Sequence, residues 1–366
     1  MSKSVVFFIN TLGCGGAEHQ ISILANELAE KGYIVTVTTY GDIPDYFNLS
    51  DKIKRIKLAP NKGKIIKLLS IWYYFLFVKA DCIISFCQRN NFFALQSLLF
   101  RSKRKLKVIC GERNLSTSKY GLMQNIFFKI LYKRANYIVS NSYSQKSFII
   151  EKYPKYSSKT FTIINYTDLN LFTFHELPNN EPRRIGIFSR YEKQKNCLMF
   201  VEAVSKVKQI SNLSFSIDWY GNQKFSNPLL KDYFVLLEKR IKDLELSQLI
   251  HLNDAVKNVP KAMLNYDIIC LPSLFEGFSN SISEAICCGK PMLVSDVSDN
   301  SLMVHESENG MLFDPTDIDS IASSIINMLN KTPDELAEMG KRSREIAETL
   351  FDKNTFLNNY IKLIEN

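Results

Sequence analysis

Metal-ligand patterns, disulfide patterns and long apolar runs are scarce in this sequence of 366 residues. The four histidines show no metal-ligand spacing and the eight cysteines form no Cys-x-x-Cys pair, so neither a zinc site nor a disulfide framework is expected. The first ten residues, MSKSVVFFIN, hold too short an apolar run for a signal peptide. These absences favour a protein of the reducing cytoplasm.

Charge is distributed unevenly along the chain. Residues 1–170 hold 25 Lys and Arg against 10 Asp and Glu, whereas the remainder holds 21 against 27. The first half is therefore strongly basic and the second mildly acidic, although the net charge of the whole is +9. Such asymmetry predicts that the first half meets an anionic partner, either nucleic acid or a membrane surface.

Alternating strand-like and helix-like segments begin at the start of the chain. The continuous apolar run at 4–10 predicts a buried strand, a glycine-rich turn follows at 11–16, 17–32 carries a helical apolar stripe, and 33–40 is β-branched. A strand–helix–strand unit of this length implies a parallel sheet. Further strands are expected at 81–87, 107–112, 137–142 and 161–166.

The same alternation restarts after the polar segment HELPNNEPRR at 175–184. Strands are expected at 185–190, 215–221, 249–254, 267–273 and 291–296. The fold class is therefore α/β, with two tandem Rossmann-like domains that face an interdomain cleft at the carboxyl ends of their strands. We expect domains at 1–174 and 175–350, and a last helix at 351–366 that packs back on the first domain.

Two glutamates stand out in FEGFSNSISEAICCGKP, residues 275–291. Each has an ordinary explanation: Glu276 could be a solvated loop acid, and Glu284 could complete a capping box with Ser281. Together they follow a buried strand and flank a helix N-terminus, which suits a phosphate. Because carboxylates repel phosphate but accept hydrogen bonds from sugar hydroxyls, the combination indicates a nucleotide sugar.

Two cations follow the first strand of the second domain, in IFSRYEKQKN at 187–196. Arg190 and Lys195 could be solvated, or they could converge on a diphosphate and neutralise the charge of a leaving group without a metal. Near the start, LGCGGAE at 12–18 departs from the dinucleotide fingerprint because Glu18 stands where a glycine is required. An NAD-dependent oxidoreductase remains an alternative, although no acid ends the second strand.

Another candidate is the end of the strand at 107–112, in GERN at 111–114. There Glu112 and Arg113 would face the cleft, unless they form an ordinary loop ion pair. Asp317 and Asp319 resemble a metal-binding motif, but acids at that position are more typical of a helix N-terminus.

Taken together, the two-glutamate motif, SRYEKQKN and GGAE resemble glycosyltransferase family 4, whose members are retaining enzymes of GT-B fold. The similarity runs the full chain: FTIINYTDLNLF (161–172) is similar to the crossover into the second domain and ENGMLFDP (308–315) to the loop after the last strand.

The resemblance implies a role for each matching residue and for the enzyme as a whole. Arg190 and Lys195 bind the donor diphosphate, Glu276 contacts the transferred sugar, and Glu284 binds the ribose. The remaining implied donor contacts are the backbones of Phe278, Ser279 and Asn280, and the close approach allowed by Gly15 and Gly16. The family implies a UDP-linked donor, no metal or other cofactor, and a glycan or lipid-diphosphate-linked acceptor in bacterial surface polysaccharide synthesis.

The sequence departs from the family's pattern at one position in the first domain. Many members carry a histidine where this chain has GERN, and its hydrogen bond to the donor sugar would fall to Glu112 or Arg113. The departure keeps a non-catalytic nucleotide-sugar-binding protein open as a further alternative.

The most basic stretch combines cations with aromatic residues. Residues 52–67 hold seven Lys and Arg, WYYFLF follows at 72–77, and RSKRKLK at 101–107 adds five more cations. The apolar run at 68–78 is shorter than the ~20 residues that span a bilayer. The stretch is either a buried helix with a solvated basic face or an amphipathic patch on an anionic leaflet. We expect a peripheral protein on the inner face of the cytoplasmic membrane, and no nucleic acid because no nucleic-acid module is present.

Overall fold

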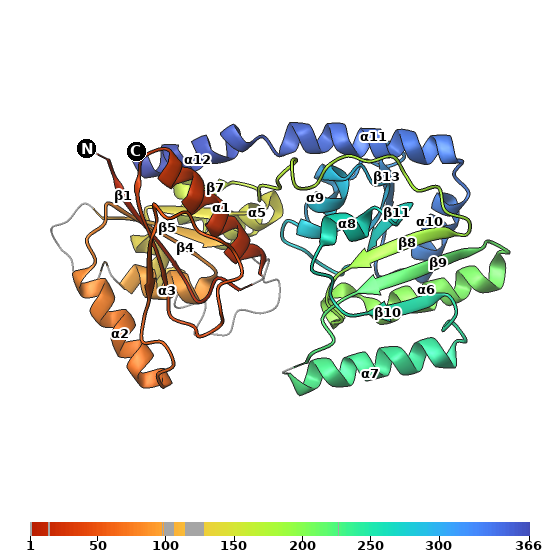
Figure 1. Cartoon of the computed structure of the whole chain (residues 1–366), viewed down its shortest axis with the longest axis horizontal. Helices are drawn as coiled ribbons and strands as arrows, with labels where there is room; N and C mark the ends of the chain where they lie inside the picture. The colour runs from red at the N-terminus through yellow and green to blue at the C-terminus, as the bar shows by residue number, and fades with distance from the viewer. Residues whose placement is uncertain (1, 14, 97, 99–105, 114–127, 226) are drawn as a thin grey trace. The chain divides into compact units, whose positions relative to one another are not determined.

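The computed structural model describes residues 2–13, 15–96, 98, 106–113, 128–225 and 227–366. The chain divides into two compact units. The first unit comprises Met1–Tyr166 together with Lys353–Asn366, and the second comprises Thr167–Asp352. Each unit is built around a parallel sheet (Figure 1).

The first unit contains a seven-stranded sheet in the order β3-β2-β1-β4-β5-β6-β7. Its strands are β1 (Ser4–Ile9), β2 (Ile34–Thr39), β3 (Lys54–Lys57), β4 (Cys82–Phe86), β5 (Lys107–Glu112), β6 (Tyr137–Ser140) and β7 (Thr160–Thr162). β1 lies at the point where the strand order reverses, with Val5 beside Val35 on one side and Cys82 on the other. In such sheets ligands bind outside the carboxyl ends of the strands near this reversal.

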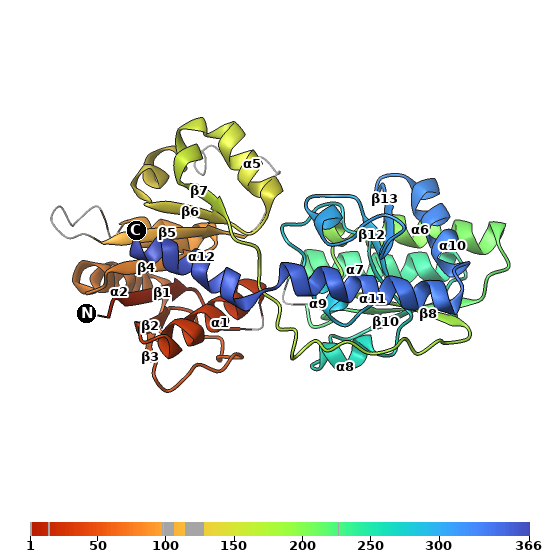
Figure 2. The same ribbon diagram turned by 90° about the horizontal axis from the view of Figure 1, so that it is seen from above.

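Helices cover both faces of the first sheet. They are α1 (Gly16–Glu30), α2 (Lys64–Phe77), α3 (Gln88–Gln96), α5 (Tyr143–Lys152) and the C-terminal α12 (Lys353–Glu365). Figures 1 and 2 show α12 beside α1 on one face of the sheet. α2 and α3 contribute Ile71, Phe75 and Phe93 to the apolar cluster on the opposite face.

The second unit contains a six-stranded sheet in the order β10-β9-β8-β11-β12-β13. Its strands are β8 (Arg183–Phe188), β9 (Phe215–Tyr220), β10 (Ile250–Asn253), β11 (Ile268–Leu271), β12 (Met292–Ser295) and β13 (Gly310–Phe313). Its helices are α6 (Cys197–Ile210), α7 (Pro228–Asp243), α8 (Val259–Met263), α9 (Asn280–Cys287), α10 (Ile318–Leu329) and α11 (Pro333–Leu350). β8 and β11 meet at the centre, where the strand order reverses, so the loops that follow them lie at the position where ligands bind.

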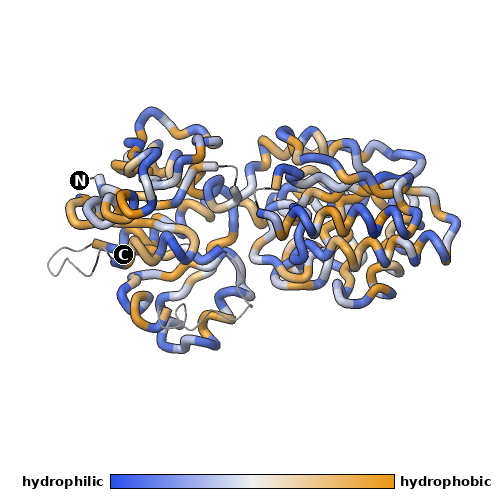
Figure 3. The backbone as a smooth tube through the Cα atoms, turned by 90° about the horizontal axis from the view of Figure 1, so that it is seen from below, coloured by the Kyte–Doolittle hydropathy of each residue, from blue (hydrophilic) through white to orange (hydrophobic). Residues whose placement is uncertain are grey.

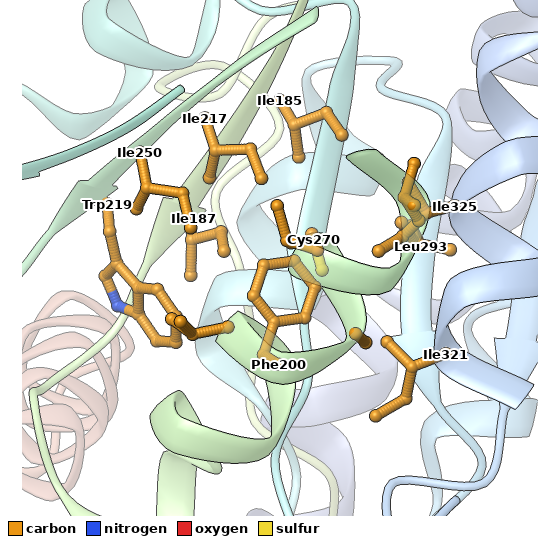
Figure 4. Close-up of a cluster of buried hydrophobic side chains, with 14 of the residues drawn as sticks. Ile185, Ile187, Phe200, Ile217, Trp219, Ile250, Cys270, Leu293, Ile321 and Ile325 are labelled. Atoms are coloured by element: carbon orange, nitrogen blue, oxygen red, sulfur yellow. The ribbon is translucent and has the colours of Figure 1, made fainter. Parts of the chain in front are cut away.

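The main core of the second unit joins one face of its sheet to α6, α7 and α10. Ile187, Trp219 and Leu293 point from the strands toward Phe200 of α6 and Ile325 of α10 (Figure 4). This alternation of inward apolar side chains along parallel strands is what fixes the register of the sheet. Hydrophobic and hydrophilic stretches alternate along the chain in both units (Figure 3).

The unit boundaries differ from those expected from sequence, 174/175 and 350/351. The chain passes between units after Tyr166 and again after Asp352. The reason at the first boundary is Arg344 of α11, whose Nη1 donates to the carbonyl oxygens of Phe172 at 2.9 Å and of Cys287 at 2.8 Å. The segment that follows Tyr166 is thereby held against the second unit.

Two strands were not predicted. β3 (Lys54–Lys57) lies inside the stretch interpreted as a basic patch, and its side chains are at most half-buried. The expectation that 308–315 forms a loop after the last strand was wrong, because β13 (Gly310–Phe313) lies within it and pairs with β12.

Candidate functional site

The candidate site of the second unit is formed by the loops that follow β8 and β11. A short 3-10 turn, Lys193–Lys195, comes after β8, and the segment 272–279 joins β11 to α9. Leu274 donates its N–H to the Gln194 carbonyl at 2.8 Å, and Gln194 Nε2 donates to the Phe275 carbonyl at 2.9 Å. These two bonds fasten the loops to each other.

Lys195 and Glu276 meet across these two loops. Lys195 Nζ lies 2.5 Å from Glu276 Oε1, and both side chains are mostly buried. The Glu276 backbone is fixed as well, because its N–H donates to Ser298 Oγ at 3.1 Å while that hydroxyl donates to the Glu276 carbonyl at 2.7 Å. A buried ion pair held on fixed backbone presents its remaining N–H donors and carboxylate oxygen in a defined geometry.

Arg190 contacts neither Lys195 nor Glu276 in the described ion pairs. Its side chain is 68% exposed, and its Nη2 forms an ion pair with Glu192 Oε1 at 2.8 Å. The sequence left open whether Arg190 and Lys195 are solvated or converge on a diphosphate. In the structure Lys195 is paired with Glu276, whereas Arg190 is exposed beside a local partner, and their shared contact with a diphosphate stays a prediction.

The start of α9 is capped by a serine other than Ser281, the cap considered from sequence. Ser279 is the N-cap and its Oγ accepts from the Ile282 N–H at 3.5 Å, whereas Ser281 Oγ donates to the Phe188 carbonyl at 2.6 Å. The capping box of Ser281 with Glu284, one of the two explanations considered from sequence, is therefore not formed. Ser281 instead ties the helix start to the end of β8, and Glu284 lies too far along the helix to cap it.

Glu284 differs from Glu276 in having no partner among the described residues. No described residue hydrogen-bonds to its half-buried carboxylate, and burial raises the pKa of this group to about 8. A half-buried carboxyl without a donor is costly unless a ligand supplies one. This arrangement is typical of a binding residue.

The other two predicted donor contacts of this segment flank the helix start. Phe278 is buried, and its ring centroid lies 6.2 Å from that of Phe351 in an edge-on arrangement. Asn280 is the first residue of α9. The ring of Phe278 thus anchors the turn, which leaves its backbone as the part available to a ligand.

In the first unit, Gly15 and Gly16 form the start of α1. Gly15 is the N-cap with extended backbone, φ −91° and ψ 156°, so its need for glycine is not one of positive φ. A Cβ on Gly15 would collide with the Glu18 carboxylate. Burial raises the pKa of Glu18, opposed by hydrogen bonds from its own backbone and from Thr11.

Glu112 is enclosed within the first unit. Its Oε1 accepts hydrogen bonds from Tyr132 Oη and, at 2.8 Å, from Asn91 Nδ2. Burial raises the pKa of Glu112 to about 7 against the opposing effect of these two donors. It therefore belongs to an internal network of this unit rather than to an exposed loop ion pair, and its contact with a donor sugar stays a prediction.

Arg113 is buried beside it and holds α12. Its Nη2 donates to Tyr360 Oη at 2.9 Å, its Nη1 donates to Asn165 Oδ1 at 2.7 Å, and its Cζ lies 3.6 Å from the Phe86 ring centroid. Asn114, the last residue of the GERN motif, lies outside the described residues, as does Cys14 of the glycine loop. Both Nη atoms of the guanidinium have structural partners, and the predicted contact of Arg113 with a donor also stays a prediction.

Sequence reasoning missed the residues that position the site. Gln194 lay inside the quoted SRYEKQKN motif but carried no charge to single it out. Ser298 gave no signal at all, although its φ of 54° places its hydroxyl against the Glu276 backbone. Asn91 and Tyr132 come from segments about twenty residues either side of Glu112, and no local pattern connects them.

Comparison with known proteins assigns this site to a family. The family model described as "Glycosyl transferases group 1" matches residues 171–346, nearly the whole of the second unit. The second unit is a glycosyl transferases group 1 domain. The predicted α/β architecture is confirmed, because the chain forms two parallel sheets. Its structural neighbours share the predicted GT-B fold.

Two bacterial relatives match the chain over different lengths. The chain is 25% identical over 361 residues to the N-acetylgalactosamine-N,N'-diacetylbacillosaminyl-diphospho-undecaprenol 4-alpha-N-acetylgalactosaminyltransferase of Campylobacter jejuni, covering 94% of this chain and 95% of the relative. It is 28% identical over 136 residues, 37% of this chain and 33% of the relative, to the UDP-Gal:alpha-D-GlcNAc-diphosphoundecaprenol alpha-1,3-galactosyltransferase of Escherichia coli.

A solved structure supports the fold. The Anabaena protein HepE in complex with UDP superposes with a TM-score of 0.77 at 18% identity, and the match covers 100% of both chains. At this identity the similarity establishes the architecture only.

Proposed function

We propose that this protein is a retaining glycosyltransferase of family 4. It moves a hexosyl or N-acetylhexosaminyl group from a nucleotide sugar, UDP-linked, to a glycan or lipid-diphosphate-linked acceptor in bacterial surface polysaccharide synthesis. The observation that carries the proposal is the buried Lys195–Glu276 pair beside the start of α9. Glu284 of the same helix has no hydrogen-bond partner among the described residues. Support comes from two relatives named for transfer to diphospho-undecaprenol acceptors and from a structural neighbour that binds UDP.

The geometry suits each predicted role. A lysine ammonium has three N–H donors, so Lys195 can hold Glu276 and a diphosphate oxygen together. Arg190, exposed near the same loop, can swing onto the diphosphate as its charge develops. Glu276 then accepts hydrogen bonds from hydroxyls of the transferred sugar, and Glu284 from those of the ribose.

Retention follows if the reaction takes place on one face of the sugar. The bond from the anomeric carbon to the diphosphate oxygen breaks while the acceptor oxygen bonds to the same face. The acceptor's hydroxyl proton passes to the leaving diphosphate, whose charge Lys195 and Arg190 stabilise. No metal enters this scheme, because the two cations supply the neutralisation.

The oxidoreductase alternative fits the first unit poorly. A dinucleotide site needs an acid after the second strand to hold the ribose hydroxyls. The acid available there, Asp42, is ion-paired with Lys67, whose hydrogen bond lowers the pKa of Asp42. A carboxylate committed to a lysine is a poor ribose ligand.

The test is donor turnover by purified full-length protein, with UDP release measured over a panel of UDP-sugars with and without lipid-diphosphate acceptor. We expect Glu276→Gln and Lys195→Met each to lower turnover by about a hundredfold or more while circular dichroism stays unchanged. Lys206→Met is the matched control, because Lys206 forms an exposed ion pair with Asp319 in the same unit. Full turnover in both site variants contradicts the proposed site, and donor binding without turnover in the wild type indicates the non-catalytic alternative.

We also propose that the protein works at the inner face of the cytoplasmic membrane as a peripheral protein. Its acceptor would be membrane-linked, and the first half of the chain is basic. Nucleic acid is not part of the proposal.

A further inference from the structure

The outward face of α2 (Lys64–Phe77) is apolar. Only Ile71 and Phe75 of this helix are buried, which excludes the buried helix considered from sequence. On the opposite side an unbroken series with a spacing of four faces solvent: Ile65 is 76% exposed, Leu69 63%, Tyr73 67% and Phe77 63%. A surface helix ordinarily turns polar residues outward, so an apolar outward face indicates that another surface binds there.

The neighbouring apolar residues widen this face. Ile66, Leu68, Trp72 and Leu76 are each more than 40% exposed. Beside the helix lies an apolar groove of about 560 Å³, whose lining includes Leu58 and Tyr73. In the part of the chain that the structure describes, no helix is long and apolar enough to cross a bilayer. At ~1.5 Å per residue α2 is about 21 Å long, which suits a helix that lies in the plane of a membrane.

Exposed lysines flank α2 along the chain. Lys54, Lys62, Lys64 and Lys79 are exposed and form no ion pair with an acid among the described residues. They lie on β3, on the turn before α2, at its first residue and just past its end. Apolar and aromatic residues on a helix with flanking lysines are the pattern that binds an anionic lipid leaflet.

We propose that α2 and these four lysines form a docking surface for an anionic lipid leaflet, with α2 lying flat and its Leu69–Tyr73–Phe77 side inserted. The alternative of a second copy of the chain is less favourable, since symmetric pairing of α2 would bring the unpaired lysines of two molecules together. The inference rests on the proposed lipid-linked acceptor for its purpose, because docking would bring the first unit to a substrate held in the membrane. Binding itself can be measured without turnover.

The experiment is vesicle co-sedimentation of the purified full chain at low salt, with phosphatidylcholine alone or mixed with phosphatidylglycerol. Wild type should bind the mixed vesicles and not the neutral ones, and added salt should weaken binding. Leu69→Ser/Tyr73→Ser/Phe77→Ser should lower the partition coefficient more than tenfold. Lys54→Gln/Lys62→Gln/Lys64→Gln should lower it on the order of a hundredfold.

Helix α7 of the second unit supplies matched controls. Leu229, Val235 and Leu236 are comparably exposed, and Lys231, Lys239 and Lys242 are exposed lysines of the same helix. The corresponding serine and glutamine triples on α7 should bind vesicles as the wild type does.

Three outcomes overturn the proposal: equal binding to both vesicle types, equal losses in the α2 and α7 variants, or no vesicle binding with a dimer in sedimentation that the α2 serine triple dissolves. Donor hydrolysis without vesicles, measured on the same variants, should stay at the wild-type rate. Loss of vesicle binding with hydrolysis intact separates failure of docking from failure of the proposed function.

Discussion

Replacing Glu284 with glutamine tests whether its raised pKa belongs to a ligand-binding carboxylate. Burial raises the pKa of this carboxyl to about 8 in the free protein, so at pH 7 only about one molecule in ten carries the charge. Hydrogen bonds from ribose hydroxyls favour the charged form, so a ribose ligand must draw the group into ionisation. The protonated fraction therefore weakens binding at neutral pH, and this penalty disappears as pH rises past 8.

The magnitude follows from the ionised fraction. It rises from about 0.1 at pH 7 to about 0.9 at pH 9, so the affinity for UDP should rise about tenfold over this range, equivalent to about 1.4 kcal/mol. Isothermal titration calorimetry with UDP at several pH values measures the change. The glutamine of Glu284→Gln cannot ionise, so the affinity of this variant for UDP should not change between pH 7 and pH 9.

The matched control is Glu202→Gln, which removes an acid of the same unit that is ion-paired with Arg240. This variant should keep the wild-type profile. A flat wild-type profile from pH 7 to 9 would refute the reasoning, because Glu284 would then bind protonated or not at all. The same rise in Glu284→Gln would assign the titration to another group.

Three further predictions concern the framework. Tyr360→Phe removes the hydroxyl that Arg113 donates to and should lower the free energy of unfolding by about 1.5–3 kcal/mol in urea titration. Tyr33→Phe removes an exposed hydrogen bond to Glu365 at the C-terminal end of α12 and should cost less than about 1 kcal/mol. Burial raises the pKa of Glu112 from 4.5 to about 7, so the folded protein keeps a proton that the unfolded chain releases. The free energy of unfolding should fall by up to about 3 kcal/mol as pH rises through this window, and Glu112→Gln, compared at pH 5 and pH 7.5, should not show the fall. Ser279→Ala removes the N-cap of α9 and should lower the thermal midpoint through a loss of about 1 kcal/mol; an unchanged midpoint would contradict the assignment of the cap.

The sheets were predictable because parallel strands buried on both faces appear in sequence as continuous apolar runs. Residues 4–10 are such a run and contain β1. β3 was not predicted because its sequence, KRIK, is that of an edge strand whose side chains stay partly in solvent. The last strand, Gly310–Phe313, was not predicted because the resemblance to the family assigned residues 308–315 to a loop.

The site was predictable as a set of positions but not as a set of contacts. The pattern placed Lys195 and Glu276 at strand ends, and strand ends of a parallel sheet meet at one edge. It could not choose a cap among the serines at 279, 281 and 283, since that choice depends on which backbone N–H each hydroxyl can reach. The partners of Arg113 are 52 and 247 residues away, so no local pattern could show that its guanidinium is occupied.

The two glutamates of FEGFSNSISEAICCGKP differ in whether a cation lies beside the carboxylate. Glu276 lies 2.5 Å from the ammonium of Lys195, and its second carboxylate oxygen can accept hydrogen bonds from a ligand. Glu284 has no such cation, and with the cap at Ser279 it lies beyond the first turn of α9, where the helix N-terminus stabilises an anion least. A capping role would have satisfied Glu284 inside the protein and left it nothing to offer a ligand. Because Glu284 does not cap the helix, its carboxylate is available to bind a ligand. Its raised pKa reflects the free-energy cost of burying this carboxylate without a partner.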